Sequence, residues 1–204
     1  MKNNIVIVNY GIGNLSSVAN MLRKVGSNVI ISSKPEDIIL ADKILLPGVG
    51  HFDHGMKMLR KSGLEESLNI SVIENKKPIL GICLGAQILG KGSEEGNSSG
   101  LGWIDMVCRR IPDHPQLRVP HMGWNQINIK KKSVLFSNLD VDSRFYFVHK
   151  YYMKCQSIEN SMAETSHGIE FTSVVGKENI LGTQFHPEKS LKHGLKLLNA
   201  FKDI

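Results

Sequence analysis

Short apolar runs alternate with helix-like segments through the first half of the chain. The runs are rich in valine, isoleucine and leucine and lie at residues 4–8, 28–32, 42–50 and 78–83. After the first run, apolar side chains recur with the spacing of one helix face, at Val18, Met21, Leu22 and Val25. Strands that alternate with helices favour a parallel sheet covered by helices. We therefore expect an α/β fold built on a doubly wound, mostly parallel sheet with flanking helices.

The second half of the chain is richer in strands. Strand-like segments separated by turn residues lie at 101–112, 123–130, 143–155 and 171–185. The last segment, 191–204, returns to helical spacing, with Leu191, Leu195, Leu198 and either Ala200 or Phe201 on one side. Because no repeat or linker is visible, we expect a single domain over residues 1–204, with the strand-rich half packed on the α/β half.

Composition and charge narrow the class of protein. The chain has 204 residues, of which 41% are apolar, and a formal net charge of +6. The basic residues are scattered, and the longest run, Lys130–Lys132, is short for a nucleic-acid site. No segment approaches the roughly 20 apolar residues of a membrane span, and the first apolar run is too short for a signal peptide. With three cysteines and no C-x-x-C pair, we expect a cytoplasmic protein without disulfides that binds neither nucleic acid nor membranes.

The stretch Gly-Ile-Cys-Leu-Gly, residues 81–85, follows the fourth apolar run. A nucleophile on a sharp strand-to-helix turn has a strained backbone, and Gly81 and Gly85 remove side chains that would clash there. The start of the next helix places partial positive charge beside Cys83, which favours the thiolate. The backbone N–H of Leu84 then faces the space where an oxyanion would form. The alternative is a buried strand cysteine whose glycines only allow close packing.

A nucleophilic cysteine needs a base, and one of the eight histidines has a suitable context. His186 ends an apolar run and is followed by Pro187 and Glu188. In an extended chain, residues i and i+2 face the same side. Glu188 would then orient His186 while His186 takes the thiol proton of Cys83, as in a catalytic triad.

Residues 47–54 offer two further kinds of site. The turn Pro-Gly-Val-Gly at 47–50 follows a strand and can present backbone N–H groups to an anion, although a plain β-turn is the simpler interpretation of the loop alone. His51 and His54 are three residues apart but have no obvious acidic or cysteine partner. We therefore expect no metal site.

Three motifs in this order and spacing resemble those of class I (triad-type) glutamine amidotransferases: PGVG at 47–50, GICLGAQ at 81–87 and QFHPEKS at 184–190. Within the family, the likeness is greatest to the glutaminase subunits of imidazole glycerol phosphate synthases. The stretches NYGIGNLSSV, SEEG, PHMGWN and YFVHKYY extend it over essentially the whole chain. The resemblance implies the fold of that family, glutaminase activity and no cofactor.

The resemblance also implies catalytic roles. Cys83 attacks the side-chain amide of glutamine and forms a thioester, releasing ammonia. His186 acts as general base and then as general acid, and Glu188 orients it. The implied oxyanion hole consists of backbone N–H groups around Leu84, Val49 and Gly50.

Further matching residues imply the glutamine pocket, which comprises Gln87, Glu95, His149, Lys150 and Tyr151. The carboxylate of Glu95 suits the ammonium group of the substrate. The sequence departs from the family pattern at two positions, since methionine is common where Ala86 stands and serine where Lys150 stands. A lysine side chain inside the pocket would weaken binding of that ammonium group.

A synthase partner is implied as well. The glutaminase motifs span residues 47–190, which leaves no room for a synthase domain. Most ammonia released into neutral water would be protonated, so an acceptor subunit must dock over the site. In this family the partner is a (β/α)8-barrel cyclase, which would form a heterodimer with this chain. We expect Met122 and Trp124 to lie in the interface; the alternative places Trp124 in the core.

The acceptor and the class of function leave alternatives. Imidazole glycerol phosphate formation in histidine biosynthesis is the first interpretation. Conversion of an acetamido sugar to an amidine during surface-polysaccharide synthesis is the second, suggested by GLGWID, SRFYFVH and FHPEKSLKHG. A cysteine-dependent stress protein or hydrolase would lack the distant His-Pro-Glu. A non-catalytic regulatory subunit would not need the complete set of Cys83, His186 and Glu188.

Overall fold

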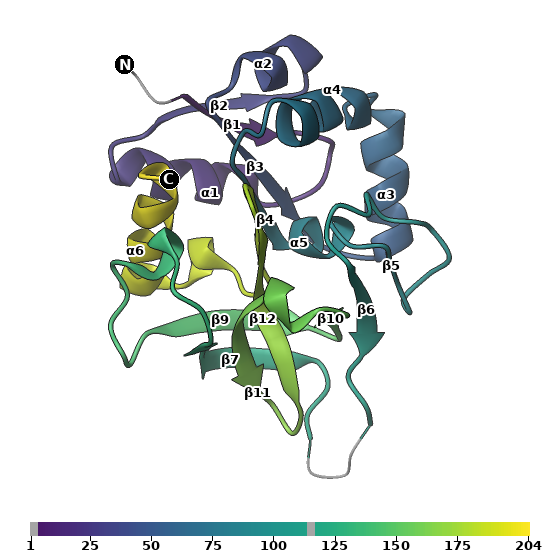
Figure 1. Ribbon diagram of the computed structural model, residues 1–204, viewed down its shortest axis with the longest axis vertical. Helices are drawn as coiled ribbons and strands as arrows, with labels where there is room; N and C mark the ends of the chain where they lie inside the picture. Colours follow the sequence, from purple (N-terminus) through teal and green to yellow (C-terminus); the bar gives the residue numbers. More distant parts are fainter. Residues whose placement is uncertain (1–3, 114–116) are drawn as a thin grey trace.

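The computed structural model describes residues 4–113 and 117–204, and one mixed 11-stranded sheet forms their frame (Figure 1). Across the sheet the strands run in the order β2 (Asn28–Ser32), β1 (Asn4–Val8), β3 (Lys43–Gly48), β4 (Ile79–Cys83), β13 (Ile180–Thr183), β12 (Glu170–Lys177), β10 (Tyr151–Cys155), β6 (Met106–Arg110) and β5 (Gly92–Ser93). Two further strands branch from this path: β11 (Ser161–Ser166) pairs with β12, and β8 (Asn128–Ile129) pairs with β11. A separate two-stranded sheet joins β7 (His121–Gln126) to β9 (Arg144–His149).

The parallel half of the sheet confirms the predicted doubly wound core. Strands β2, β1, β3, β4 and β13 pair in parallel, in that order. Every residue of β3 and β4 is buried. Continuous burial is typical of parallel strands covered by helices on both faces, which explains why these segments read as unbroken apolar runs.

Most of the strand-rich second half extends the same sheet, a connection that the sequence analysis did not specify. Strand β13, late in the chain, pairs with β4, and β12 and β10 continue the sheet in antiparallel fashion. The predicted segment 143–155 is also divided at Lys150, since β9 belongs to the small sheet and β10 to the large one. The small sheet is thereby placed beside the parallel strands.

Helices cover both faces of the sheet (Figure 1). The α-helices are α1 (Leu15–Lys24), α2 (Pro35–Leu40), α3 (Phe52–Lys61), α4 (Glu65–Asn69), α5 (Leu84–Ile88) and α6 (Leu191–Lys202). A π-helix, η1 (Ile70–Glu74), continues α4, and 3-10 turns lie at η2 (Val134–Phe136), η3 (Ile158–Asn160) and η4 (Pro187–Lys189). One apolar cluster packs the helices α2, α3, α4 and α5 against one face of the sheet. A second cluster packs α1, α6 and β9 against the opposite face. Within the described ranges, no helix is long and apolar enough to cross a bilayer.

The buried face of α6 includes Leu198, Ala200 and Phe201, as predicted, together with His193, Gly194 and Leu197. Leu195 is only partly buried. Leu191 does not belong to this face, because it begins the helix with a positive φ of 48° and is 69% exposed. Gly194 sets this orientation, because a Cβ there would lie 1.8 Å from the carbonyl oxygen of Pro187. The helix therefore packs its glycine directly against the turn that follows His186.

Candidate active site

A cavity of about 700 Å³ opens where parallel strands β3 and β4 end. This edge is where open α/β sheets bind ligands. The cavity is lined by all residues predicted for catalysis, the oxyanion hole and the glutamine pocket: Cys83, His186, Glu188, Leu84, Val49, Gly50, Gln87, Glu95, His149, Lys150 and Tyr151. Sequence reasoning did not assign Asn14, His51, Pro120, Val148 and Lys189 to it. Residues distant in the chain thus meet in one cavity.

The turn at Cys83 has the strained geometry expected of a nucleophile elbow. Strand β4 ends at Cys83 and α5 begins at the next residue, with φ +54° and ψ −111° at the cysteine. Such a backbone costs roughly 1–3 kcal/mol for a residue with a side chain. A Cβ on Gly81 would lie 2.7 Å from the backbone of Ala86, and one on Gly85 would lie 1.8 Å from the carbonyl oxygen of Leu46. Both glycines are therefore required, as predicted, and Ala86 is buried behind the turn.

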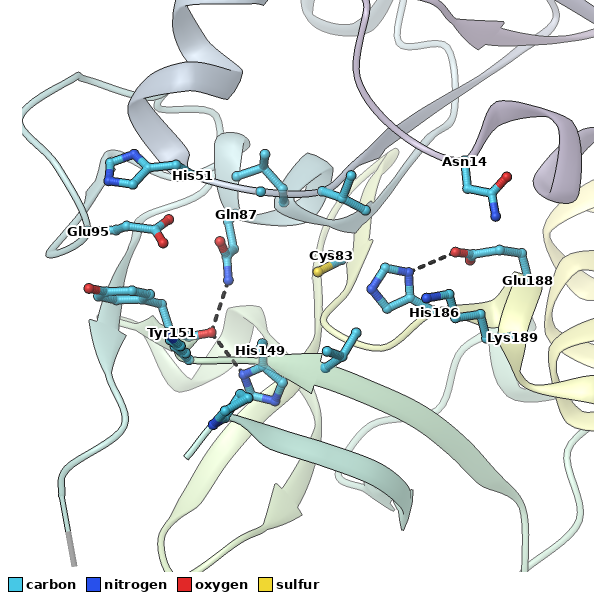
Figure 2. Close-up of a pocket in the computed structure, with 16 residues that line it drawn as sticks. Asn14, His51, Cys83, Gln87, Glu95, His149, Tyr151, His186, Glu188 and Lys189 are labelled. Carbon is cyan, nitrogen blue, oxygen red and sulfur yellow. Dashed lines mark hydrogen bonds and ion pairs between the residues drawn. The ribbon is translucent and has the colours of Figure 1, made fainter. Parts of the chain in front are cut away.

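His186 lies between Cys83 and Glu188 (Figure 2). Its Nδ1 is 2.7 Å from Oε1 of Glu188, and both side chains are almost completely buried. Burial by itself lowers the pKa of His186, but hydrogen bonds to Cys83 and Glu188 and the negative charge on each outweigh burial and raise that pKa well above its ordinary value. Because Nδ1 donates to Glu188, Nε2 remains for the thiol. This arrangement favours the imidazolium form of His186.

The contact between His186 and Glu188 does not arise from an extended chain, as the sequence argument assumed. Pro187–Lys189 forms the 3-10 turn η4, which returns the Glu188 carboxylate to the ring. The peptide N–H of His186 donates to the carbonyl of Tyr146 at 2.9 Å. The hydroxyl of Ser190 donates to the His186 carbonyl at 2.6 Å and accepts from the N–H of Tyr146 at 2.9 Å. Strand β9 therefore holds the backbone of His186 in place.

Two glutamines connect the cavity wall to the sulfur. Nε2 of Gln87 donates to the carbonyl of Tyr151 at 3.0 Å and to Oε1 of Gln184 at 3.1 Å. Nε2 of Gln184 in turn donates to Sγ of Cys83 at 3.8 Å. Sequence reasoning assigned no role to Gln184, although its position two residues before His186 was a usable signal.

Glu95 and His51 lie at the end of the cavity away from Glu188 (Figure 2). The carboxylate of Glu95 accepts from the N–H of Phe52 at 2.8 Å, which ties it to the start of α3. His51 caps the same helix, with Nδ1 accepting from the N–H of Asp53 at 3.2 Å. Among the residues that the structure describes, no group of three or more metal-ligating side chains forms. His51 thus caps the start of α3.

The Pro-Gly-Val-Gly loop borders Cys83 directly. The β3–β4 ladder continues to the pair Gly48 and Cys83, so the loop leaves the sheet beside the sulfur. Val49 is 42% exposed, and Gly50 has a φ of +96° that favours glycine. The loop is therefore in position to offer backbone N–H groups to the cavity.

Met122 and Trp124 lie outside the cavity on β7. Their side chains are 62% and 45% exposed, so the alternative that placed Trp124 in the core is wrong. Along β7 the side chains alternate, and His121 between the two sheets is 3% exposed. The strand thus presents two large apolar side chains to solvent.

This chain is similar to known proteins over nearly its whole length. The model of the family "Glutamine amidotransferase class-I" matches residues 6–203. The "Imidazole glycerol phosphate synthase subunit HisH 2" of Pseudomonas aeruginosa is 46% identical over 200 residues, which is 98% of this chain and 99% of that one. The protein of the same name from Methanococcus maripaludis is 47% identical, covering 97% and 98%. The HisH subunit of Bdellovibrio bacteriovorus is 42% identical over 203 residues, covering 98% and 100%.

Solved structures agree on the fold. A "glutamine amidotransferase" crystal structure superposes with a TM-score of 0.74 at 17% identity, covering 98% of this chain and 99% of that one. A chain of PurLQS from Thermotoga maritima gives 0.75 at 16% identity, covering 100% and 99%. At such identities the likeness concerns the fold. The match of the family model over nearly the full length and relatives above 40% identity establish that this chain belongs to the class I glutamine amidotransferases.

Proposed function

We propose that this chain is the glutaminase subunit of an imidazole glycerol phosphate synthase, and that Cys83, His186 and Glu188 form its catalytic triad. The observation that carries the proposal is the buried alignment of these three side chains in one cavity. Burial strengthens their mutual interactions, because little water screens them. The relatives' names support the histidine-pathway acceptor, and none of those given above refers to an amidino sugar.

The chemistry follows from the protonation of the pair. The thiol proton of Cys83 moves to His186, and the thiolate attacks the carboxamide carbon of glutamine. His186 then gives this proton to the departing nitrogen, so ammonia leaves and a thioester remains. Neutral His186 next takes a proton from water, whose oxygen attacks the thioester; collapse of this intermediate releases glutamate and regenerates the thiolate. Glu188 stabilises the imidazolium form throughout.

Each attack places negative charge on the substrate's carbonyl oxygen. The backbone N–H groups of Leu84, Val49 and Gly50 are our candidates for the oxyanion hole, because all three residues line the cavity beside Cys83. The glutamine pocket would be formed by Gln87, Glu95, His149, Lys150 and Tyr151, which the same cavity brings together. The Glu95 carboxylate would face the substrate's ammonium.

A cyclase with a (β/α)8-barrel is the proposed partner, in a cytoplasmic heterodimer. Ammonia must reach the acceptor unprotonated, which requires a partner that shields the site from water. Met122 and Trp124 support docking at β7, because exposed aromatic and methionine side chains are typical interface anchors. Other exposed apolar side chains, such as Ile158, lie elsewhere on the surface.

A diazoketone analogue of glutamine tests the proposed nucleophile in the complex with the cyclase. We expect one covalent adduct on Cys83, and excess glutamine should prevent it. The two other cysteines are internal controls, because burial raises the pKa of the Cys155 thiol to about 11 and raises that of Cys108 still further. Peptide mapping by mass spectrometry identifies the site. Modification of another residue, or labelling that ignores glutamine, would refute the assignment.

Replacement of Trp124 with alanine should weaken association with the cyclase about 10- to 100-fold, because a central aromatic anchor is lost. Titration calorimetry measures the dissociation constant. Ile158→Ala is the matched control, since Ile158 is 79% exposed and away from β7, and it should bind normally. An unchanged dissociation constant for Trp124→Ala would place the interface elsewhere.

A further inference from the structure

A chain of hydrogen bonds runs beneath the exposed face of β7. Nδ2 of Asn125 lies 3.2 Å from Nε2 of His121, and Nδ1 of His121 lies 3.0 Å from Nε2 of His149. Nδ1 of His149 lies 2.9 Å from the carbonyl oxygen of Tyr151. Three side chains thus connect the strand that carries Trp124 to the wall of the glutamine pocket.

Only one arrangement of protons satisfies all of these hydrogen bonds when both histidine rings are neutral. The Tyr151 carbonyl can only accept, so Nδ1 of His149 carries the hydrogen and Nε2 accepts. His121 must then donate from Nδ1 and accept at Nε2, and the amide of Asn125 supplies that last hydrogen. The same amide donates to the carbonyl of Ser166 at 2.9 Å, which fixes its orientation.

Burial keeps both rings neutral. Burial, together with the neighbouring His121, lowers the pKa of His149 to about 3. Burial and the stacked ring of His167, 4.0 Å away between centroids, lower the pKa of His121 to about 4. Phe147 covers His121 at 4.7 Å between ring centroids. At neutral pH the direction of the hydrogen bonds is therefore set by the fold.

Beyond Tyr151, the series of hydrogen bonds continues to the proposed nucleophile, Cys83. The Tyr151 carbonyl also accepts from Gln87, as Figure 2 shows, so it holds His149 and Gln87 at once. Gln87 donates its other amide hydrogen to Gln184, which donates to Cys83. With both hydrogens engaged, Gln87 retains only its oxygen for a ligand.

The side chains of β7 alternate between the proposed docking face and this series of hydrogen bonds. Met122 and Trp124 point to solvent, whereas His121 points inward, directly across from His149 in the β7–β9 ladder. A partner that presses on the outer side chains of β7 therefore acts on the strand that holds His121 and Asn125.

We propose that Asn125, His121 and His149 form a positioning relay, through which the docked partner orients the Tyr151 carbonyl and Gln87 for glutamine binding. The proposal rests on the proposed glutaminase function. None of the three side chains takes part in the chemical step. They act through Tyr151 and Gln87, so their loss should affect the affinity for glutamine more than the turnover of bound substrate.

Nitrogen NMR of the histidine rings tests the relay without any assay of activity. We expect His121 and His149 to be neutral at pH 7 and to carry hydrogen on Nδ1, the tautomer that a free imidazole disfavours. Detection of hydrogen on Nε2 of His149, or of a charged ring, would overturn the proposal. This result is independent of whether the chain hydrolyses glutamine.

Kinetics in the complex give the second test. His121→Leu keeps the bulk but removes the hydrogen bonds, and should raise KM for glutamine about 5- to 20-fold with a smaller change in kcat. His121→Asn can place an amide donor near the lost Nδ1 and should remain within about threefold of the natural protein. Equal losses in both variants, or none in His121→Leu, would refute the relay.

Two controls separate other causes. Asn125→Ala, at a half-buried position, should also raise KM. This variant provides the test if His121→Leu folds poorly. Ile158→Ala, at an exposed position outside β7 and outside the cavity, should leave KM unchanged. Ammonia-dependent synthesis should be unaffected in every variant. Absence of glutamine hydrolysis in the natural complex would refute the proposed function, and the relay would then stand or fall on the NMR result.

Discussion

Replacement of Cys83 with alanine is expected to abolish glutamine-dependent synthesis by the complex, with a loss of at least about a thousandfold in kcat. The methyl group cannot form the thioester, and no other thiol lines the cavity, since Cys108 and Cys155 lie elsewhere. Synthesis supplied with ammonium salts at alkaline pH should continue at the natural rate, because we propose that the acceptor chemistry takes place in the partner. Product formation is measured with each nitrogen source in turn.

Cys155→Ala provides the matched control for this variant. Its thiol is half-buried and outside the cavity, so both nitrogen sources should support normal rates. If Cys83→Ala still used glutamine, the nucleophile would be misassigned. If it lost ammonia-dependent synthesis as well, the change would have disturbed the partner or the fold rather than the chemistry at sulfur.

Replacement of Gly85 with alanine should lower the free energy of unfolding by at least about 3 kcal/mol and remove glutaminase activity. The added Cβ would lie 1.8 Å from the carbonyl oxygen of Leu46 and 2.8 Å from its carbon, both backbone atoms of β3. Neither can rotate away, so α5 and β3 must separate and the turn at Cys83 must shift. Urea unfolding measures the loss.

Gly92→Ala is the control for this substitution. A Cβ there meets its nearest atom at 3.6 Å, which is ordinary contact. We expect a change within about 1 kcal/mol. If Gly85→Ala unfolded at the same midpoint urea concentration as the natural protein, α5 and β3 could separate at little cost in free energy. The turn at Cys83 would then be less constrained than its geometry indicates.

Sequence alone located the candidate site because its principal residues are coded locally. The glycines around Cys83 and the order His-Pro-Glu each describe a short turn whose geometry follows from neighbouring residues. The actual contact between His186 and Glu188 was predicted for the wrong reason, since a 3-10 turn makes it and an extended strand does not. The pairing of an imidazole with a nearby carboxylate was enough to predict that His186 and Glu188 interact.

Features that depend on distant contacts were not predictable. The position of Gln184 beside His186 indicates that it lies near the site, but the sequence does not show that it donates to Cys83, 101 positions away. Nothing near His121 points to His149. The division of segment 143–155 at Lys150 escaped notice because both halves have strand-like composition. The partners of a strand, which lie far along the chain, decide the sheet to which it belongs.

The left-handed backbone at Cys83 has a consequence for evolution. Glycine adopts such a conformation without steric strain, so a glycine at this position would relax the turn. If Cys83 is the nucleophile, as proposed, the chain accepts a strained backbone at this residue in order to carry a reactive thiol.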